Sequence, residues 1–359
     1  MTNSINKKIS EDKALPLITT ILPTYRRPQK LKRAIMSVLN QTYQNLVVCI
    51  YDNASCDETA SVVAELAALD NRVKYFCHSE NIGPLKNYVF GLSRVETSFF
   101  SLFADDDFLL PNFYEDAMKD FEKYPEAMFT CLSTAIADNK GRVYWESTAA
   151  FDKGLYFPPN GLLEIIKKPQ ISLAWTSILY KKEVLDCGVF IDENIKLISD
   201  VDWGLKCCAK FPFVINAKRG AMFCINNNFI CYKNLVDDVW PDWDIIVDNV
   251  MRNEDVHINV RQQINDWLVR ILEGNLKIIV NNAIWLKNYE QAYKAIDLIN
   301  IYCKQPDEAA KLLRKVQFIH KTILLNYLYL FYSKVKHYYV FNIKSIFITT
   351  NLKKIDLPK

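Results

Sequence analysis

The feature that most constrains the fold is a regular alternation, in the first third of the chain, between short apolar runs and segments with helical spacing of apolar residues. The runs are rich in β-branched residues and have the length of buried strands, whereas the segments between them have the length of helices. Apolar strands joined by helices favour a parallel sheet covered on both faces, with right-handed crossovers. The predicted class is α/β. The predicted strands are 17–22, 46–51, 73–77 and 98–103, and the predicted helices are 59–69, 85–92, one that begins near Pro28 and one that follows Pro111.

The rest of the chain divides into two parts. Residues 127–230 mix strand patterns, at 127–132 and 177–180, with a helical pattern at 201–209. From about residue 240 onward only helical spacing remains. The clearest helical stripe consists of Trp267, Leu268, Ile271, Leu272, Leu276 and Ile279. We therefore predict a polar tail at 1–14, an α/β domain at 15–235 and a helical region at 236–359.

Composition excludes several classes of protein. A chain of 359 residues with 50% hydrophobic and 24% charged residues can bury a sizeable core, and its net charge of +3 does not suit a nucleic-acid binder. The 10 cysteines form no CxxC pair and the 4 histidines lie far apart, which favours reduced thiols and no zinc site. No signal-peptide pattern and no apolar run of about 18–20 residues is present. We expect the protein in the cytosol.

Polar residues follow each of the first four predicted strands. They are the segments 23–27, 52–59, 80–83 and 104–107. Ligands of open parallel sheets bind at the carboxyl ends of the strands. We therefore expect these four segments to lie along one edge of the sheet and to form a binding site.

The most informative of these segments contains three consecutive aspartates, Asp105, Asp106 and Asp107. Adjacent carboxylates repel one another unless a cation or strong donors lie among them. Mg²⁺ and Mn²⁺ prefer oxygen ligands, and magnesium often binds one or two carboxylates together with substrate phosphates. The run therefore indicates a metal and diphosphate site. A solvated acidic turn that caps the next helix is the alternative.

The segment after the second strand has two interpretations as well. Asp52 either makes a local turn or faces a pocket. Ser55 and Glu58 have the spacing of a capping box for the next helix, so we expect Ser55 to cap that helix. Tyr25, after the first strand, either stacks on a flat base or fills the edge of the sheet.

Together these segments resemble family 2 inverting glycosyltransferases, which have the GT-A fold. The motifs P-T-Y-R, S-V-L-x-Q-T-Y, D-N-x-S-x-D-x-T, E-N-x-G and D-D-D-x-L-L-P occur in the family's order within 15–135. A weaker similarity continues to about residue 230. The resemblance implies a Rossmann-like, mostly parallel sheet flanked by helices, to which this chain adds its helical C-terminal region.

The resemblance also implies the residues that bind a nucleotide-sugar. Asp52 would accept a hydrogen bond from a ring N–H of uracil, and Asn81 and Lys86 would lie near the base or ribose. The metal, Mg²⁺ or Mn²⁺, would be held by Asp107, Asp106 or Asp105. Ala104 stands where the family often has another aspartate, which leaves the choice among the three open. The full set implied for the nucleotide-sugar is Pro23, Thr24, Tyr25, Arg26, Asp52, Asn81, Lys86, Asp105 and Asp106.

The segment IDENIKLISDVDWGLK resembles the acceptor side of the same family. Asp200 matches the family's catalytic base, with Asp202 as the second candidate, and Trp203 would line the acceptor pocket or else belong to the core. A lone aspartate at a helix start is otherwise usually an N-cap. No histidine stands in the 224–228 stretch, where many relatives have a metal ligand. The Q-x-x-R-W signature of processive synthases is absent, which favours transfer of a single sugar.

The predicted function is therefore inverting, nonprocessive transfer of a sugar from a UDP-sugar to a hydroxyl group of a saccharide or lipid-linked acceptor. Bacterial cell-surface polysaccharide or lipopolysaccharide synthesis is the setting that the resemblance implies. An inactive sugar-binding module with the same fold is the alternative. A dehydrogenase or nucleotidyltransferase is disfavoured, because no G-x-G-x-x-G or other glycine-rich loop follows the first strand.

The basic, aromatic segment 311–350 has three possible roles. An amphipathic basic helix can lie on the cytoplasmic face of an anionic membrane. The segment can equally form a helical cap on the catalytic domain, or a contact between copies in a homo-oligomer. The sequence does not choose among these three.

Overall fold

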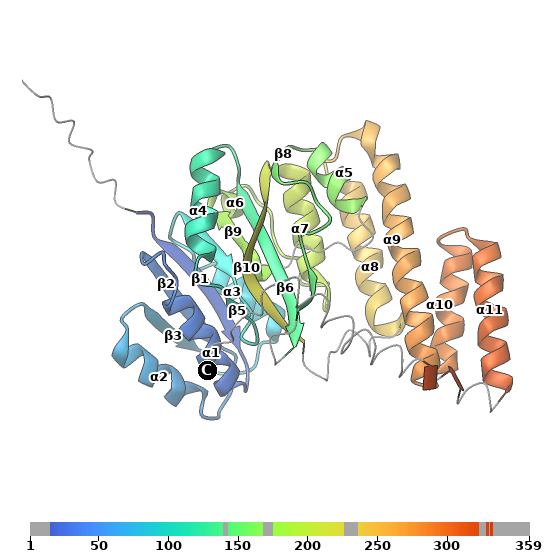
Figure 1. Cartoon of the computed structure of the whole chain (residues 1–359), viewed down its shortest axis with the longest axis horizontal. Coiled ribbons are helices and arrows are strands. Elements are labelled where there is room, and N and C mark those ends of the chain that lie inside the picture. The colour runs from blue at the N-terminus through green and yellow to red at the C-terminus, as the bar shows by residue number, and fades with distance from the viewer. Residues whose placement is uncertain are drawn as a thin grey trace, which may run out of the picture.

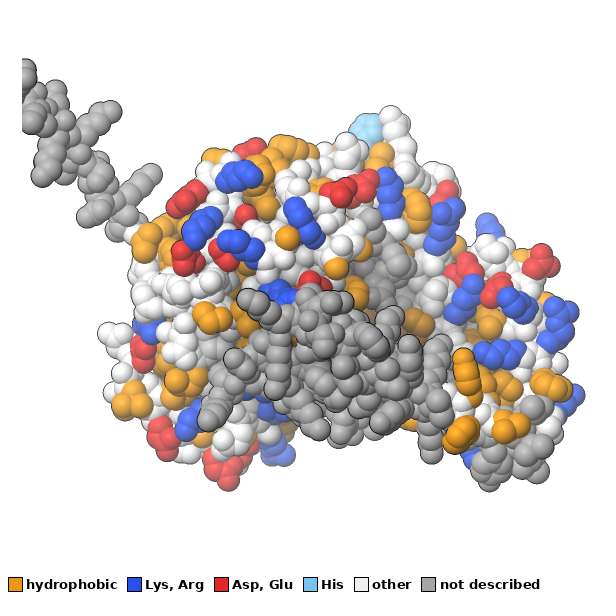
Figure 2. Space-filling model, in the orientation of Figure 1, with side chains coloured by type: hydrophobic (Ala, Val, Ile, Leu, Met, Phe, Trp, Pro, Cys, Tyr) orange, Lys and Arg blue, Asp and Glu red, His pale blue; other side chains and the backbone are white. Residues whose placement is uncertain are grey.

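The computed structural model describes residues 15–138, 143–167, 175–225, 236–322, 328–329 and 331–332. A sheet flanked by helices forms one part of the molecule, and helices α8 to α11 lie side by side next to it (Figure 1). The predicted tail at 1–14 and most of the segment 311–350 lie outside the described residues. On the face shown in Figure 2, acidic and basic side chains of the described residues are interspersed.

The sheet has ten strands in the described residues, and its main order is β3-β2-β1-β4-β9-β6-β10-β5. β1, β2, β3 and β4 pair in parallel, and so do β6 and β10, whereas β9 runs antiparallel to both β4 and β6. β7 pairs with β6, and β8 pairs with β10. The strands are β1 Ile18–Thr24, β2 Leu46–Asp52, β3 Val73–Cys77, β4 Phe99–Leu102, β5 Phe108–Leu109, β6 Phe129–Asp138, β7 Val143–Glu146, β8 Gly154–Tyr156, β9 Ile178–Lys181 and β10 Phe213–Ile225.

Helices cover both faces of this sheet. The α-helices of the sheet part are α1 Pro28–Leu39, α2 Thr59–Leu69, α3 Pro84–Leu92, α4 Phe113–Lys123, α5 Asn160–Ile166, α6 Glu183–Asp186 and α7 Ser199–Lys210. Alternate residues of one strand point to opposite faces. Ile18 and Leu22 of β1 thus pack in one core with α1, α2 and α4, whereas Ile21 packs in a second core with α3, α5 and α7.

The strand register brings three strand ends together. Thr24, the last residue of β1, lies opposite Asp52, the last residue of β2. On the other side of β1, Ile21 lies opposite Leu102, the last residue of β4, and the run of aspartates follows shortly after it. The segments at 23–27, 52–59 and 104–107 therefore meet at one edge of the sheet, as their order in the sequence predicted.

The C-terminal helices extend the second core. They are α8 Val236–Arg252, α9 Ile258–Trp285, α10 Tyr289–Ile301 and α11 Pro306–Lys321. Their apolar faces belong to the same hydrophobic cluster as α5, α7 and one face of the sheet. This cluster includes residues from Ile21 in β1 to Ile319 in α11. No helix within the described ranges is both long and apolar enough to cross a membrane.

The structure confirms the α/β class, the mostly parallel sheet and the helical C-terminal part. One local prediction is wrong. Ser55 does not cap α2, because its hydroxyl contacts Asp52 and the N–H of Arg26, while the carboxylate of Asp57 accepts the N–H of Thr59 at the helix start. The strand β10 was not predicted, since its run is interrupted by Asn216, Lys218 and Arg219.

Candidate active site

The first carboxylate of the acidic run faces the end of β1. Asp105 is buried, and its Oδ2 accepts a hydrogen bond of 2.8 Å from the Thr24 hydroxyl. Its Oδ1 lies 3.0 Å from Nη1 of Arg27. Burial raises the pKa of Asp105, and the nearby guanidinium opposes that rise. The carboxylate therefore lies where additional positive charge would be favourable.

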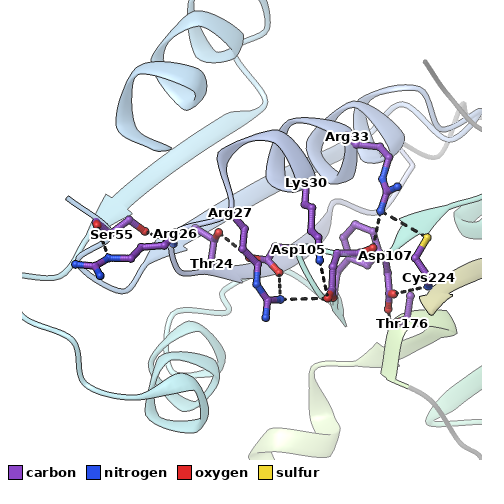
Figure 3. A network of polar contacts seen from close by, with 12 residues as sticks. Thr24, Arg26, Arg27, Lys30, Arg33, Ser55, Asp105, Asp107, Thr176 and Cys224 are labelled. Carbon is purple, nitrogen blue, oxygen red and sulfur yellow. Dashed lines mark hydrogen bonds and ion pairs between the residues drawn. The ribbon is translucent and has the colours of Figure 1, made fainter. Parts of the chain in front are cut away.

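The second aspartate, Asp106, has two cationic side chains at its carboxylate and a third at its main-chain carbonyl oxygen. These three side chains, Arg27, Lys30 and Arg33, are labelled in Figure 3. Asp106 Oδ2 lies 3.2 Å from Nη1 of Arg27 and 3.5 Å from Nζ of Lys30. Nη2 of Arg33 donates a hydrogen bond of 2.6 Å to the carbonyl oxygen of Asp106. One Arg27 nitrogen thus bridges the carboxylates of Asp105 and Asp106.

The third carboxylate turns into the protein. Asp107 is buried, its Oδ2 accepts a hydrogen bond of 2.7 Å from the Thr176 hydroxyl, and its Oδ1 accepts one of 3.2 Å from the N–H of Cys224. Burial raises its pKa to about 7, and Asp106 adds to the rise. Both of its oxygens are therefore engaged by the loop before β9 and by β10.

At the end of β2, Asp52 is held in one orientation. It is 2% exposed. Its Oδ1 accepts from the N–H of Ser55 at 2.9 Å and from the Ser55 hydroxyl at 2.5 Å, and its Oδ2 accepts from the Tyr75 hydroxyl at 2.6 Å. The main-chain N–H of Arg26 donates to the Ser55 hydroxyl oxygen at 2.9 Å, which ties the loop after β1 to the loop after β2.

The loops beside Asp52 have strained backbones. Arg26, Ala54 and Cys56 all have positive φ angles, of 53°, 58° and 52°, and such conformations cluster at functional sites. Tyr25 is 37% exposed, and the guanidinium of Arg26 lies 5.1 Å from its ring centre. An exposed aromatic ring at a strand end is available for stacking on a base.

The loop after β3 joins this group. Asn81 is exposed, and its Oδ1 accepts hydrogen bonds of 2.9 Å from Nδ2 of Asn53 and from the N–H of Gly83. Lys86 is exposed on α3. Asn81 is thus linked to Asn53, the neighbour of Asp52, and Lys86 follows in the first turn of α3.

Asp200 lies in the other half of the α/β part, beyond β9 in the sequence. It lies in the first turn of α7, is partly exposed, and accepts a hydrogen bond of 3.0 Å from the N–H of Val201. Desolvation raises its pKa. Tyr88 of α3 connects the two sides, because burial raises the pKa of its phenol and the carboxylates of residues 105–107 and of Asp200 raise it further.

Tyr88 was not predicted from the sequence. Its hydroxyl donates a long hydrogen bond of 3.4 Å to the carbonyl oxygen of Phe103, and its ring packs edge-on against Trp175 at 5.2 Å between ring centres. The only signal in the sequence was its place in the helix that follows the polar loop 80–83. The charges of both the aspartate run and Asp200 therefore act on one phenol of α3.

Two predicted residues do not face this site. Asp202 is fully buried, with Oδ2 2.5 Å from Nζ of Lys206 and Oδ1 accepting a hydrogen bond of 3.0 Å from Nδ2 of Asn249, so it is part of an internal polar cluster. Trp203 is 0% exposed and packs edge-on against Tyr180. Of the two alternatives for Trp203, an acceptor-pocket residue or a core residue, its burial favours the core.

The acidic run fits a divalent cation through two of its three members. No group of three or more His, Cys, Asp and Glu side chains in the described ranges is arranged to hold a metal ion. Magnesium, however, commonly uses one or two carboxylates and completes its shell with water and substrate phosphate. Asp105 and Asp106 provide such a pair, with a cationic nitrogen already between them. Asp107 fits less well because it is 1% exposed and its oxygens accept from Thr176 and from the N–H of Cys224. The oxygens of Asp105 are engaged as well, but by Thr24 and by the cationic Arg27, whose place a metal ion would take.

A mostly parallel α/β sheet with carboxylates at the ends of its strands is typical of glycosyltransferases with the GT-A fold. Residues 19–188 match the family model described as glycosyl transferase family 2, and this part of the chain belongs to that family. The match ends before α7 and does not include Asp200.

Among curated proteins, the chain is similar to a GalNAc(5)-diNAcBac-PP-undecaprenol beta-1,3-glucosyltransferase of Campylobacter jejuni. The two are 35% identical over 120 residues, which are 33% of this chain and 39% of the relative. It is also 32% identical over 123 residues to a chondroitin synthase of Escherichia coli, covering 34% of this chain and 17% of that protein. The matched part is thus well under half of either relative.

Solved structures share the fold. S. aureus TarS 1-349 in complex with UDP-GlcNAc superimposes with a TM-score of 0.62 at 16% identity, over 79% of this chain and 80% of that one. The mannosyltransferase PcManGT from Pyrobaculum calidifontis, in complex with GDP-Man and Mn²⁺, has a TM-score of 0.53 at 13% identity, over 95% and 88% of the two chains. These likenesses establish the GT-A fold, including its extension into the helical part.

Proposed function

We propose that the protein is an inverting, nonprocessive glycosyltransferase that moves one sugar from a UDP-sugar to a hydroxyl group of a saccharide or lipid-linked acceptor. The observation that carries this proposal is that Asp52 and the aspartate run follow neighbouring strand ends. The charges of the aspartate run and of Asp200 also act on one phenol, that of Tyr88. The UDP-GlcNAc bound by the structural neighbour TarS supports the choice of donor. The name of the Campylobacter relative includes a lipid-linked saccharide, GalNAc(5)-diNAcBac-PP-undecaprenol, and this supports a lipid-linked acceptor.

On the donor side, Asp52 would accept the ring N–H of uracil and Tyr25 would stack on the base. Pro23, Thr24 and Arg26 shape the adjoining loop, and Asn81 and Lys86 would lie along the base and ribose. Asp52 suits this role because Ser55 and Tyr75 fix its carboxylate before any ligand arrives. A preorganised acceptor loses little freedom on binding.

The diphosphate would lie beside Asp105 and Asp106, which would hold Mg²⁺ or Mn²⁺. When bound there, the cation would offset negative charge on the leaving diphosphate. The Mn²⁺ in the PcManGT structure supports this assignment. Arg27 and Lys30, which contact the same carboxylates, supply further positive charge toward the phosphates.

On the acceptor side, Asp200 would act as the general base. It would take the proton from the acceptor hydroxyl as that oxygen attacks the anomeric carbon from the face opposite the leaving diphosphate, so the configuration inverts. Desolvation raises the pKa of Asp200, which makes its carboxylate a stronger base than that of an ordinary aspartate. Partial exposure keeps its carboxylate accessible to an acceptor.

The setting that we propose is the cytoplasmic face of the membrane, in the synthesis of a bacterial cell-surface polysaccharide or lipopolysaccharide. The support is the basic character of the segment 311–350, of which α11 is the described part, together with the lipid-linked acceptor named for the Campylobacter relative. α11 ends with His320 and Lys321 in its last turn, and Phe318 is largely exposed on it.

The experiment that tests the function is a donor screen that measures release of the nucleoside diphosphate with Mn²⁺ and with EDTA. We expect turnover of a UDP-sugar in the presence of Mn²⁺ and its loss in EDTA. The variant Asp200→Asn should reduce kcat by about 10²-fold or more, because one general base is removed, while the affinity for UDP stays unchanged. Turnover that survives in Asp200→Asn would contradict the assignment of the base, and UDP binding without any transfer would favour an inactive sugar-binding module.

A further inference from the structure

The loop that leads into α7, directly before Asp200, is held to the C-terminal helices by a buried carboxylate. Asp242 of α8 is 2% exposed. Its Oδ1 accepts a hydrogen bond of 3.0 Å from the N–H of Lys196. Its Oδ2 accepts from the N–H groups of Lys196, Leu197 and Ile198, at 3.1, 2.6 and 3.3 Å. Three consecutive main-chain donors thus converge on one side chain.

These donors lie directly before the candidate base. Ile198 is the N-cap residue of α7, and its side chain makes no capping bond. Helix starts usually obtain a cap from a local Ser, Thr, Asp or Asn. Here the stretch that leads into the helix is held by a carboxylate from another element, 42 residues after Asp200 in sequence numbering. Charge-assisted hydrogen bonds of this kind are stronger than neutral ones.

A second contact from the same helix holds the other side of the loop. Asn249 lies seven residues after Asp242, which places both on one face of α8. Its Nδ2 donates hydrogen bonds of 3.0 Å to Oδ2 of Asp192 and to Oδ1 of Asp202. The segment 192–202 is therefore held from one face of α8 at three places, and Asp200 lies between two of them.

We infer that Asp242 is a positioning residue for the transfer reaction: its carboxylate fixes the main chain at 196–198, and thereby sets where the Asp200 carboxylate stands relative to the acceptor and the donor. This inference rests on the proposed function, because it takes Asp200 to be the base. It assigns part of the active site to α8, which lies beyond the segment that matches the family.

Replacement by asparagine tests the inference with little change of volume. In Asp242→Asn one carboxylate oxygen becomes an NH₂ group, which would face main-chain N–H donors and push the loop away. We expect kcat to fall by about 10- to 100-fold, since displacement of a reacting group by about 1 Å can cost that much. The affinity for UDP and the KM for the donor should stay within about 2-fold, because the donor residues lie on other loops.

The pH profile of kcat/KM distinguishes a positioning role of Asp242 from a simple loss of folded protein in the variant. Asp200 owes its raised pKa to desolvation in its present place at the start of α7. A displaced loop would expose the carboxylate, so the acidic limb of kcat/KM should move to lower pH in Asp242→Asn. A smaller fraction of folded enzyme would lower the whole profile without moving the limb.

The matched control is Asp244→Asn, which makes the same change of charge two residues away, on the exposed side of α8. It should keep the wild-type kcat and pH profile. Hydrogen exchange at the amides of 196–198 should become faster in Asp242→Asn only. If Asp242→Asn does not fold, Asp242→Glu takes its place: it keeps the carboxylate but lengthens the side chain, and it should show the same loss of kcat.

The outcomes keep the two proposals apart. If the wild type transfers sugar and Asp200→Asn does not, but the Asp242 variant that folds keeps the wild-type kcat and acidic limb, the positioning role is overturned and the proposed function stands. If the wild type transfers no sugar, or Asp200→Asn transfers it normally, the proposed function fails and the inference fails with it.

Discussion

At the scale of single residues, the site consists of carboxylates whose surroundings differ. Asp52 is fixed by hydrogen bonds from its own loop and from Tyr75, Asp105 and Asp106 face the cations of α1, and Asp107 turns into the protein. Asp200 has a raised pKa and remains partly exposed. The same side-chain type can therefore recognise a base, balance a cation, support the fold or take a proton, according to what surrounds it.

We expect Asp52→Ala to weaken binding of UDP by about 1.5–3 kcal/mol, the usual effect of losing a hydrogen bond to a charged group. Isothermal titration calorimetry measures this directly, and a thermal melt checks that the variant is folded. The control is Glu65→Ala, which removes an exposed carboxylate from α2. Equal UDP affinity in wild type and Asp52→Ala would remove Asp52 from the nucleotide site.

The pH dependence of transfer should reflect the raised pKa of Asp200. A general base works only when it is deprotonated, so activity is lost as the pH falls through its pKa. Because desolvation raises that pKa, the acidic limb of kcat/KM should lie above about pH 3.9, the ordinary value of an aspartate. UDP affinity measured over the same pH range separates this effect from donor binding. A limb at or below that value would argue against Asp200 as the base.

At the scale of elements, the position of α3 depends on one glycine. An added Cβ at Gly91 would lie 2.5 Å from Cγ2 of Ile21 and 3.0 Å from the ring of Tyr51, so the helix lies unusually close to β1 and β2. The same helix contains Tyr88, whose phenol is influenced by the charges of the aspartate run, and the exposed Lys86. Close packing of α3 therefore determines how near the phenol comes to the aspartate run.

We expect Gly91→Ala to destabilise the protein by about 1–3 kcal/mol, as is typical of overpacking. It should also reduce turnover, because α3 must move away from the sheet. Gly274→Ala is the control: Gly274 lies inside α9 with nothing within 4 Å of an added Cβ. That change should stabilise the protein by about 0.5–1 kcal/mol through helix propensity. Urea denaturation measures both, and equal effects of the two substitutions would contradict the packing argument.

At the scale of the whole molecule, the sheet and the C-terminal helices share a hydrophobic core. One cluster of buried side chains runs from β1 and β4 through α5, α7 and α8 to α9, α10 and α11. Polar contacts cross the same boundary, between Asp242 or Asn249 and the loop before α7. The helical region therefore supports the sheet part, although the family match covers only the first part of the chain.

We expect the two parts to unfold together because they share this core. Hydrogen exchange in increasing urea should give the amides of β1 and of α9 the same free energy of opening. Leu276→Ala, in the buried face of α9, should lower both by about 2–5 kcal/mol. Loss of protection in α9 while β1 stays protected would show two independent units instead.

The sequence alone predicted the parallel part of the sheet and which strand ends form the candidate site. Strand and helix periodicity is local, and the ends of parallel strands must meet at one edge, so Thr24, Asp52 and the aspartate run could be placed together without coordinates. The helical character of the C-terminal part followed from the same periodicity. Each of these conclusions depends only on neighbouring residues and on one general rule of sheet topology.

The tertiary structure decided which way each side chain turns. Asp200 and Asp202 are two residues apart, yet one is partly exposed beside Tyr88 and the other is buried against Asn249 of α8. Trp203 lies in the core, the Ser55 hydroxyl donates a hydrogen bond to Asp52, and Asp107 accepts one from Thr176. Side-chain direction depends on packing against elements that are distant in sequence, and no local pattern of residues contains that information.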